Sequence, residues 1–337
     1  MKPVFHVLYN LPARITHFHL LMMLMFLSML SAAQPEHCLV IHGGAGGMNR
    51  EKMSPERQEL FLFHLDRALH TGDSVLRAGG TSTDAVVATI TYLEECPLFN
   101  AGKGAVFSWE GRNELDASIM DGASLKAGAV AGVTTIRNPI RAARAVMEKS
   151  PHVLLSGKGA EAFARDQGLK KVSNRFFFTR ERYDQLKALK KKTREREQAD
   201  NHGTVGCLAL DRYGNLCAGT STGGMTGKRY GRIGDTPLIG AGTWADNSTC
   251  AVSCTGHGEF FIRGNIAREV AARMEFKGET LQEASTGALA KLTAMGGTGG
   301  FIALDRKGNL SMPFNTTGMF RGHISSTGEK KTAIFVP

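Results

Sequence analysis

The apolar positions of the chain form two kinds of pattern, short uninterrupted runs and runs with helical spacing. The short runs predict buried strands at residues 38–42, 127–135, 205–210, 216–222, 251–254 and 300–304. Spacings of three and four residues predict helices from about 54 to 76, 84 to 95, 138 to 147, 262 to 276 and 281 to 295. Two of these helices begin with Ser54-Pro55 and Asn138-Pro139, pairs that are typical of helix N-termini. Because strands and helices come in blocks, the pattern predicts an α+β fold in which helices cover sheets.

An internal repeat sharpens the strand prediction. LALDRYGNL at 208–216 and IALDRKGNL at 302–310 each predict two strands joined by a five-residue Asp-x-x-Gly-Asn turn. If Leu210 faces Leu216 in the first hairpin, Thr204 falls opposite Thr222, although a bulge would shift this register by one residue. Two threonines are therefore expected at the open end of this hairpin.

The stretch from Arg180 to Asp200 differs from the rest of the chain because Lys, Arg, Glu and Gln dominate it. Such a composition cannot bury a core, so it predicts a charged helix that grades into a solvated linker, at about 180–203. The alternative is an ordinary long surface loop that leads into the strand at 205.

The N-terminal segment resembles a secretory signal peptide covering residues 1–33. Lys2 and Arg14 precede an apolar run at 20–30, and the small residues at 31–33 suit a cleavage site. The run is shorter than the roughly 20 apolar residues that span a bilayer, so no stable membrane anchor is expected. A functional signal predicts a periplasmic or secreted protein, whereas a misassigned start codon predicts a cytoplasmic one.

Composition excludes several classes of protein. A hydrophobic share of 42% rules out wholesale disorder, and the net charge of +10 is compatible with a solvated basic surface without implying a nucleic-acid partner. The six cysteines include no CxxC pair and lie mostly in apolar stretches, which predicts buried free thiols.

Three glycine-rich motifs imitate known sites without meeting their requirements. Residues 219–223 fit GxSxG, but glycines follow where a nucleophile elbow needs a helix. Gly227-Lys228 lacks the upstream glycine of a P-loop, and the glycines at 43–47 do not satisfy GxGxxG. Nucleotide phosphate sites are therefore not expected.

The pair Gly203-Thr204 has chemistry of its own at the end of the charged stretch. A threonine hydroxyl needs an adjacent base, and a threonine freed as a chain N-terminus carries one in its α-amine, which titrates near 7.7–8.0. Glycine tolerates the twisted backbone from which the hydroxyl can attack the preceding carbonyl. We therefore predict cleavage between Gly203 and Thr204, against the alternative that the pair is merely structural.

Eight ordered segments point to one family: VIHGGAGG (40–47), EECPLFNAGKGAVF (94–107), ELDASIMDG (114–122), KAGAVAGV (126–133), HGTVG (202–206), TSTGGMTGKRYGRIGDTPLIGAGTWADN (220–247), SCTGHGE (253–259) and PFNTTGM (313–319). From about residue 38 to its end the chain resembles the isoaspartyl peptidase/L-asparaginase family of plant-type asparaginases, which are N-terminal nucleophile hydrolases. The resemblance implies a four-layer αββα sandwich. It also implies a single catalytic domain (34–337) that cleaves itself into an α fragment (34–203) and a β fragment (204–337), with two αβ units forming a dimer.

The same resemblance implies roles for site residues. Thr204 matches the nucleophile, Thr222 the hydroxyl that orients it, and Asn100 an active-site asparagine whose role the match leaves open. Further matches are Arg232 and Asp235 as a clamp for a free α-carboxylate and α-ammonium, and Thr255 with the backbone N–H of Gly256 as the oxyanion hole. Without the family, Arg232 and Asp235 would be interpreted as a surface ion pair and Thr255 as part of a turn. His257, beside the oxyanion hole, stands where several bacterial relatives carry a small hydroxyl residue.

The implied clamp defines a substrate class. L-asparagine and isoaspartyl dipeptides share one zwitterionic aspartate head, so one site can hydrolyse both amides. No cofactor is expected for catalysis. The family's structural sodium ion matches the backbone carbonyls of Leu93, Glu94, Cys96, Phe99, Ala101 and Lys103.

Two other functions remain open. A glycosylasparaginase shares the fold, but its typical Asp before the nucleophile is Gly203 here. A secreted binding protein that has lost catalysis would not need to retain Thr204, Thr222, Arg232, Asp235 and Thr255 together.

Overall fold

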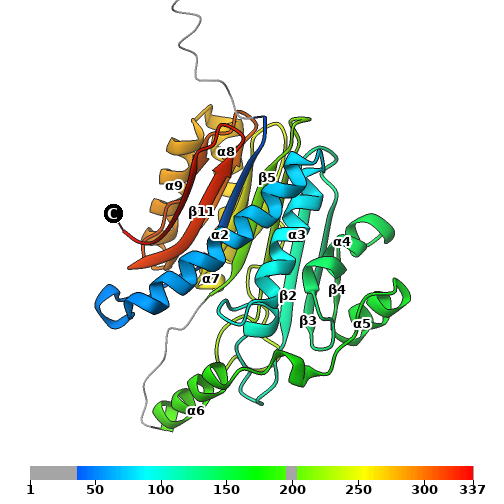
Figure 1. The fold of residues 1–337 in the computed structure, drawn as a ribbon, viewed down its shortest axis with the longest axis vertical. Helices are drawn as coiled ribbons and strands as arrows, with labels where there is room; N and C mark the ends of the chain where they lie inside the picture. The colour runs from blue at the N-terminus through cyan, green and yellow to red at the C-terminus, as the bar shows by residue number, and fades with distance from the viewer. Residues whose placement is uncertain (1–35, 195–202, 337) are drawn as a thin grey trace, which may run out of the picture. The chain divides into compact units, whose positions relative to one another are not determined.

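The computed structural model describes residues 36–194 and 203–336, so the signal peptide predicted at 1–33 and the end of the linker lie outside the described residues. These ranges form a mixed α+β structure with two sheets, of strand order β12-β11-β1-β5-β6-β2-β3-β4 and β10-β9-β8-β7 (Figure 1). The pair β3–β4 is parallel, and the other strand pairs are antiparallel. The strands are β1 (Cys38–Gly46), β2 (Leu115–Asp121), β3 (Ala127–Val133), β4 (Leu154–Ser156), β5 (Val205–Leu210), β6 (Leu216–Thr222), β7 (Thr243–Ala245), β8 (Cys250–Gly256), β9 (Gly299–Asp305), β10 (Leu310–Ser311), β11 (Gly318–Ser325) and β12 (Lys330–Phe335).

Helices pack against both sheets. The α-helices are α2 (Pro55–Arg77), α3 (Ser82–Glu95), α4 (Pro139–Lys149), α5 (Gly157–Asp166), α6 (Arg180–Arg194), α7 (Gly258–Gly264), α8 (Ile266–Lys277) and α9 (Leu281–Ala294). Helices α2, α3 and α4 contact the larger sheet, whereas α8 and α9 contact the smaller one (Figure 1). Strands β5 and β6 also contact β8, so the two sheets meet each other.

The central strand β1 shows why the strands are continuous apolar runs in the sequence. Leu39 and Ile41 point into the core shared with α2 and α3, whereas Cys38 and Val40 point into the core between the sheets. Successive side chains of a strand alternate between its two faces, so a strand buried on both faces has no polar positions to alternate with apolar ones.

The elements that were predicted are largely confirmed, with three corrections, whereas strands β2, β4, β7, β11 and β12 and helix α5 were not predicted. Ser54 caps α2 by accepting a hydrogen bond from the Arg57 backbone N–H, as expected. Helix α3 starts at Ser82 and is capped by Thr81, two residues earlier than predicted. Asn138 precedes Pro139 but its side chain does not cap α4, because it donates to Glu95 instead.

The third correction concerns the helix predicted from 262 to 276. The chain forms α7 and α8 there, separated at Asn265, whose φ of 49° lies in the left-handed region and ends a helix. The apolar spacing continues across the break, which is why the pattern alone did not reveal it.

The predicted hairpin register is confirmed. Leu210 faces Leu216 and Val205 faces Ser221 without a bulge, so the next pair outward is Thr204 and Thr222. The repeated turns are also alike, since Asp211 accepts backbone hydrogen bonds from Tyr213 and Asn215 as Asp305 does from Lys307 and Asn309. The Asp side chain thus closes each turn.

The charged stretch is only partly what its composition predicts. The predicted charged helix is present as α6, and it is not wholly solvated, because Leu186 is 1% exposed. Leu186, Leu189 and Tyr183 hold this short helix against the domain, the last two beside Gly227 and Phe107.

All six cysteines are buried free thiols, as predicted. Across residues 36–194 and 203–336, no helix is long and apolar enough to cross a membrane.

Candidate active site

The end of the β5–β6 hairpin brings two threonine hydroxyls together. Thr204 Oγ1 donates to Thr222 Oγ1 across 3.2 Å, and both residues are buried. The Thr222 hydroxyl in turn donates to the carbonyl oxygen of Gly203 at 3.0 Å and accepts from the Gly224 backbone N–H at 3.0 Å. Hydrogen-bond direction therefore runs from Thr204 through Thr222 to the carbonyl that precedes Thr204.

A second donor reaches the same carbonyl from the loop after α3. Asn100 Nδ2 lies 2.6 Å from the carbonyl oxygen of Gly203 and 2.7 Å from that of Gly224. Its Oδ1 accepts the backbone N–H of Val106 at 2.9 Å, which settles which end of the amide is the donor. Two side chains thus direct hydrogens at the Gly203 carbonyl oxygen, where negative charge would develop during attack by Thr204.

The glycines of the HGGAGG segment let this arrangement close. A Cβ on Gly43 would stand 2.5 Å from the ring of Phe99, the residue before Asn100. A Cβ on Gly44 would stand 3.1 Å from Gly203 Cα, and the φ of Gly44 is 114°. Larger residues at either position would push the Asn100 loop or Gly203 away.

Sequence analysis missed His42, which is fully buried behind Thr204. Its Nδ1 lies 3.0 Å from the carbonyl oxygen of Thr204, and because a carbonyl only accepts, Nδ1 carries the hydrogen. Its Nε2 lies 2.9 Å from Ser253 Oγ, so that hydroxyl donates to it. Burial lowers the pKa of His42 to about 3, which keeps the ring neutral. His42 therefore holds the backbone of Thr204 in place and is not a base.

From Ser253, a series of buried hydroxyl groups in hydrogen-bond contact continues between the two sheets. The oxygen distances are 2.7 Å for Ser253–Thr220, 2.6 Å for Thr220–Thr243 and 2.7 Å for Ser118–Thr243. Ser118 also lies 2.6 Å from the Thr236 carbonyl oxygen, so its single hydrogen has two acceptors. The series connects the back of Thr204 to the residue that follows Asp235. Thr220, one of three consecutive hydroxyl residues in TSTGG, was a sequence signal for it.

The two predicted clamp residues, Arg232 and Asp235, do not form an ion pair with each other. Arg232 makes a two-pronged ion pair with Glu259, with Nε and Nη2 each 2.8 Å from a carboxylate oxygen. Asp235 is 5% exposed, and its Oδ2 has no hydrogen-bond partner among the described residues. Burial raises the pKa of Asp235 to about 7. The alternative of a surface ion pair between Arg232 and Asp235 is therefore wrong, and Glu259 is a partner that the sequence reasoning missed.

The end of β8, which carries Thr255, lies beside the glycine segment and beside Arg232 and Asp235. Thr255 Oγ1 accepts the backbone N–H of Ala45 at 3.3 Å, which places it next to the glycine segment. A Cβ on Gly258 would stand 2.8 Å from Asp235 Oδ1 and 2.9 Å from Arg232 Nη2. The segment from Thr255 to Gly258, which includes Gly256 and the predicted oxyanion hole, therefore runs from the glycine segment to the clamp.

His257 lies on this segment as well. Its Nε2 is 3.2 Å from a carboxylate oxygen of Glu259, the same group that pairs with Arg232. The side chain is thus part of the clamp's surroundings.

A charged cluster that the sequence reasoning missed lies behind Thr222. Lys228 Nζ donates to the Glu114 carbonyl oxygen at 2.9 Å and lies 3.9 Å from Asp116 Oδ2. Asp116 is fully buried and faces Thr222 in the β2–β6 register. Burial raises the pKa of Asp116, partly offset by Lys228.

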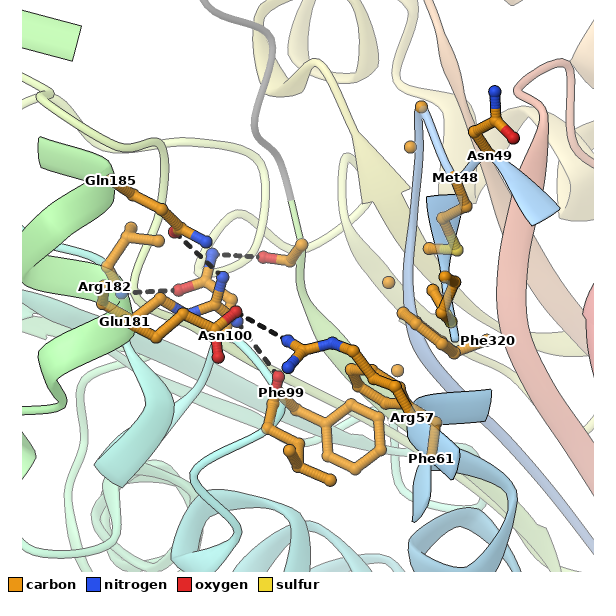
Figure 2. A pocket seen from close by; sticks show the side chains of 18 residues that line it. Met48, Asn49, Arg57, Phe61, Phe99, Asn100, Glu181, Arg182, Gln185 and Phe320 are labelled. Atoms are coloured by element: carbon orange, nitrogen blue, oxygen red, sulfur yellow. Dashed lines mark hydrogen bonds and ion pairs between the residues drawn. The ribbon is translucent and has the colours of Figure 1, made fainter. Parts of the chain in front are cut away.

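A cavity of about 300 Å³ opens beside the Gly203 carbonyl (Figure 2). Its lining combines Asn100 and Gly203 with the side chains of Glu181, Arg182 and Gln185 from α6. Arg232, Asp235 and Thr255 do not line it. The cavity therefore belongs to the Gly203 side of the bond between Gly203 and Thr204.

The loop expected to hold sodium is closely packed, and two of its glycines pass next to backbone carbonyls. A Cβ on Gly102 would stand 2.2 Å from the Glu94 carbonyl oxygen, and one on Gly104 would stand 2.0 Å from that of Phe99. Backbone carbonyls are ligands that hard cations accept. Among the described residues, no cluster of His, Cys, Asp or Glu could hold a metal ion.

Comparison with known proteins places the whole described region in one group. A family model described as Asparaginase matches residues 35–334. An isoaspartyl peptidase of Escherichia coli (strain K12) is 50% identical over 292 residues, which cover 84% of this chain and 91% of that protein. An isoaspartyl peptidase/L-asparaginase of Rattus norvegicus is 44% identical over 274 residues (80% and 81%), and one of Bos taurus is 41% identical over 285 residues (83% and 91%). Every residue of the site described above lies within the family match.

Proposed function

Since this chain belongs to the asparaginase family, we propose that it is a self-cleaving threonine hydrolase that releases aspartate from β-aspartyl dipeptides and deamidates L-asparagine. The observation that carries the proposal is the Gly203 carbonyl, which accepts hydrogen bonds from Asn100 and Thr222 while the Thr204 hydroxyl lies beside it. An ordinary Gly-Thr peptide bond needs no such pair of donors.

In the proposed cleavage, Thr204 Oγ attacks the carbonyl carbon of Gly203. The oxyanion accepts hydrogen bonds from Asn100 and Thr222, the C–N bond breaks, and the proton of the hydroxyl ends on the Thr204 nitrogen. Water then hydrolyses the resulting ester. The products are an α fragment that ends at Gly203 and a β fragment that begins with a free Thr204 amine.

In the proposed turnover, that amine takes the proton from Thr204 Oγ as the oxygen attacks the β-carbonyl of the substrate. Thr255 and the Gly256 N–H stabilise the oxyanion, ammonia or the amino acid leaves, and water hydrolyses the β-aspartyl ester. Arg232 binds the α-carboxylate and Asp235 the α-ammonium. Glu259 occupies only one edge of the Arg232 fork, so the Nη1–Nη2 edge can still take a carboxylate. An ammonium group would satisfy the unpartnered Asp235 Oδ2.

Several further expectations belong to this proposal. Helices on both outer faces of two meeting sheets support a four-layer αββα arrangement. Carbonyls of Leu93, Glu94, Cys96, Phe99, Ala101 and Lys103 would hold a sodium ion, which would stiffen the loop that carries Asn100. Two αβ units would form the dimer, and residues 1–33 would direct the protein to the periplasm or the exterior.

The deciding experiment is mass spectrometry of the purified protein before and after incubation, followed by rate measurements. We expect two fragments that divide at Gly203-Thr204, and no division in Thr204→Ala. Thr204→Ser keeps a hydroxyl and should still divide. A wild-type chain that stays whole would overturn the mechanism.

Rates on three substrates separate the related functions. We expect hydrolysis of L-asparagine and of β-aspartyl-leucine, and little release from asparagine-linked glucosamine. Faster turnover of the glycosylated substrate would instead identify a glycosylasparaginase. No turnover of any of the three by a fully divided protein would favour a binding function.

A further inference from the structure

One arginine of α6 binds two backbone carbonyls on opposite sides of Asn100. Arg182 Nε donates to the Gly104 carbonyl oxygen at 2.9 Å, and its Nη2 donates to that of Leu98 at 3.1 Å. The remaining prong, Nη1, donates to Gln185 on the same helix at 3.2 Å. The planar guanidinium thus bridges the two arms of the loop that presents Asn100.

The orientation of Asn100 depends on this loop. Its amide points both hydrogens at carbonyl oxygens of other segments, those of Gly203 and Gly224, and its Oδ1 accepts the Val106 N–H, while the Asn100 backbone carbonyl accepts the Gly223 N–H at 3.1 Å. Widening the loop between residues 98 and 104 would displace the donor from the Gly203 carbonyl. Hydrogen bonds weaken steeply as their distance and angle depart from ideal values, so a small displacement has a large effect.

Contacts with other elements hold helix α6 in place, so it can fix the position of the loop that it contacts. Arg57 of α2 donates to Glu181 at 2.6 Å, and Leu186 is buried. A Cβ on Gly227 would stand 2.5 Å from Leu189 Cδ2, so the helix also touches the segment that follows Thr222 and Gly224. Helix α6 therefore contacts both the loop that carries Asn100 and the segment that follows Thr222, and these supply the two donors to the Gly203 carbonyl.

We propose that Arg182 is a positioning residue for cleavage, and that α6, although it precedes the divided bond, is a working part of the cleavage machinery. This inference rests on the proposed self-cleavage. It adds that the charged segment, whose composition suggests a passive linker, determines the rate of the reaction through Asn100. The carbonyls that Arg182 uses are not among those expected to hold sodium, so the two can act together.

The first test compares cleavage rates of full-length chains by following the uncut fraction on denaturing gels. We expect Arg182→Ala to divide at least about tenfold more slowly than the wild type, and Arg182→Lys to be intermediate because an ammonium group cannot bridge both carbonyls as a fork. Arg180→Ala is the matched control, since Arg180 lies on the same helix and, among the described residues, its ion pair is with Asp184, at 2.9 Å, on the exposed surface. It should divide at the wild-type rate.

The second test asks whether Arg182 acts through Asn100. In a double-mutant cycle, Arg182→Ala should add no further slowing to Asn100→Ala, because the group it positions is gone. Independent, multiplying effects would overturn the proposal, as would a wild-type cleavage rate in Arg182→Ala. If Arg182→Ala does not fold, Arg182→Lys is judged by the same two criteria.

A third measurement detects the positioning directly. In a full-length Thr204→Ala background, which cannot divide, amide hydrogen exchange at Val106 reports the bond to Asn100 Oδ1. Arg182→Ala should speed exchange there, and Arg180→Ala should not. Unchanged protection at Val106 would contradict the inference even if cleavage is slow. A wild-type chain that never divides would instead reject the proposed function itself.

Discussion

The side-chain amide of Asn100 donates to the carbonyl oxygen of Gly203 across 2.6 Å, and this carbonyl belongs to the peptide bond that joins Gly203 to Thr204. The contact links residues 103 positions apart in the chain. It gives Asn100 a definite role in the proposed cleavage, that of an oxyanion donor.

Asn100→Ala should slow cleavage by about 10²–10³-fold, the usual cost of losing one oxyanion donor. The uncut fraction is followed by mass spectrometry over days. Asn309→Ala is the control, because the Asn309 amide serves only its own turn by donating to Asp305 at 2.8 Å. Equal rates for the two variants would remove Asn100 from the mechanism.

Thr222→Val should slow both cleavage and turnover by about 10²-fold or more, because it removes the hydroxyl between Thr204 and the Gly203 carbonyl while nearly keeping the shape. Thr222→Ser should retain much of each rate. Thr226→Val is the matched control, since the Thr226 hydroxyl is buried and has no hydrogen-bond partner among the described residues. That substitution should leave both rates near the wild-type values.

The value of kcat/KM for L-asparagine should fall as pH drops through about 7. Burial raises the pKa of Asp235 to about 7, so acidification protonates the carboxylate that must receive the substrate's ammonium group. A free α-amine on Thr204, with the usual pKa of about 7.7–8.0, would also lose activity when protonated, and would add a second fall to the curve of kcat/KM against pH.

Succinamic acid separates the two titrations, because it lacks the α-amine and has no use for a charged Asp235. Its pH profile should show only the fall due to the Thr204 amine. Identical profiles for succinamic acid and L-asparagine would mean that Asp235 does not bind the ammonium group.

Glu259→Gln should raise KM for L-asparagine about tenfold and change kcat little. Glu259 holds one edge of the Arg232 guanidinium at 2.8 Å, and losing its charge frees the fork to leave the carboxylate-binding orientation. Glu279→Gln is the matched control, because Glu279 pairs with Arg273 in the same two-pronged way at 2.7 and 2.8 Å, and neither residue contacts the clamp. A lower KM in Glu259→Gln would show that Glu259 competes with substrate for Arg232.

Glu94→Gln should change how stability depends on pH. Burial raises the pKa of Glu94 from 4.5 to about 8, although Ser221 and the Ile140 N–H oppose the shift. A raised carboxyl pKa contributes stability fully below about 4.5, and this contribution is lost as pH rises to about 8. The free energy of unfolding of the Thr204→Ala chain should therefore fall over this window by on the order of a few kcal/mol more than that of the Thr204→Ala/Glu94→Gln chain. Parallel curves in urea titrations from pH 5 to 8 would contradict the shift.

The sequence predicts best those structural features that depend on residues close to one another in the chain. Leu210, Leu216 and the Asp-x-x-Gly-Asn turn predict the hairpin and the meeting of Thr204 with Thr222, because a short loop leaves few registers in which apolar residues stay buried. The same reasoning fails at Asn265, where the apolar spacing runs through a helix break. For α6 it predicts the charged helix but not the contacts of Leu186 and Arg182 that hold this helix against the domain.

The sequence by itself determined β1, β3, β5, β6, β8 and β9, most helices, the first hairpin register and the pair Gly203-Thr204, because backbone hydrogen bonding and burial impose periods that residues record along the chain. Only the tertiary structure decided which side chains surround that pair. Asn100 lies in a loop, His42 on β1 and Glu259 on α7, and no spacing along the chain encodes the contacts that folding brings about between such separate elements. The geometry of those contacts turns an unremarkable Gly-Thr bond into a candidate for self-cleavage.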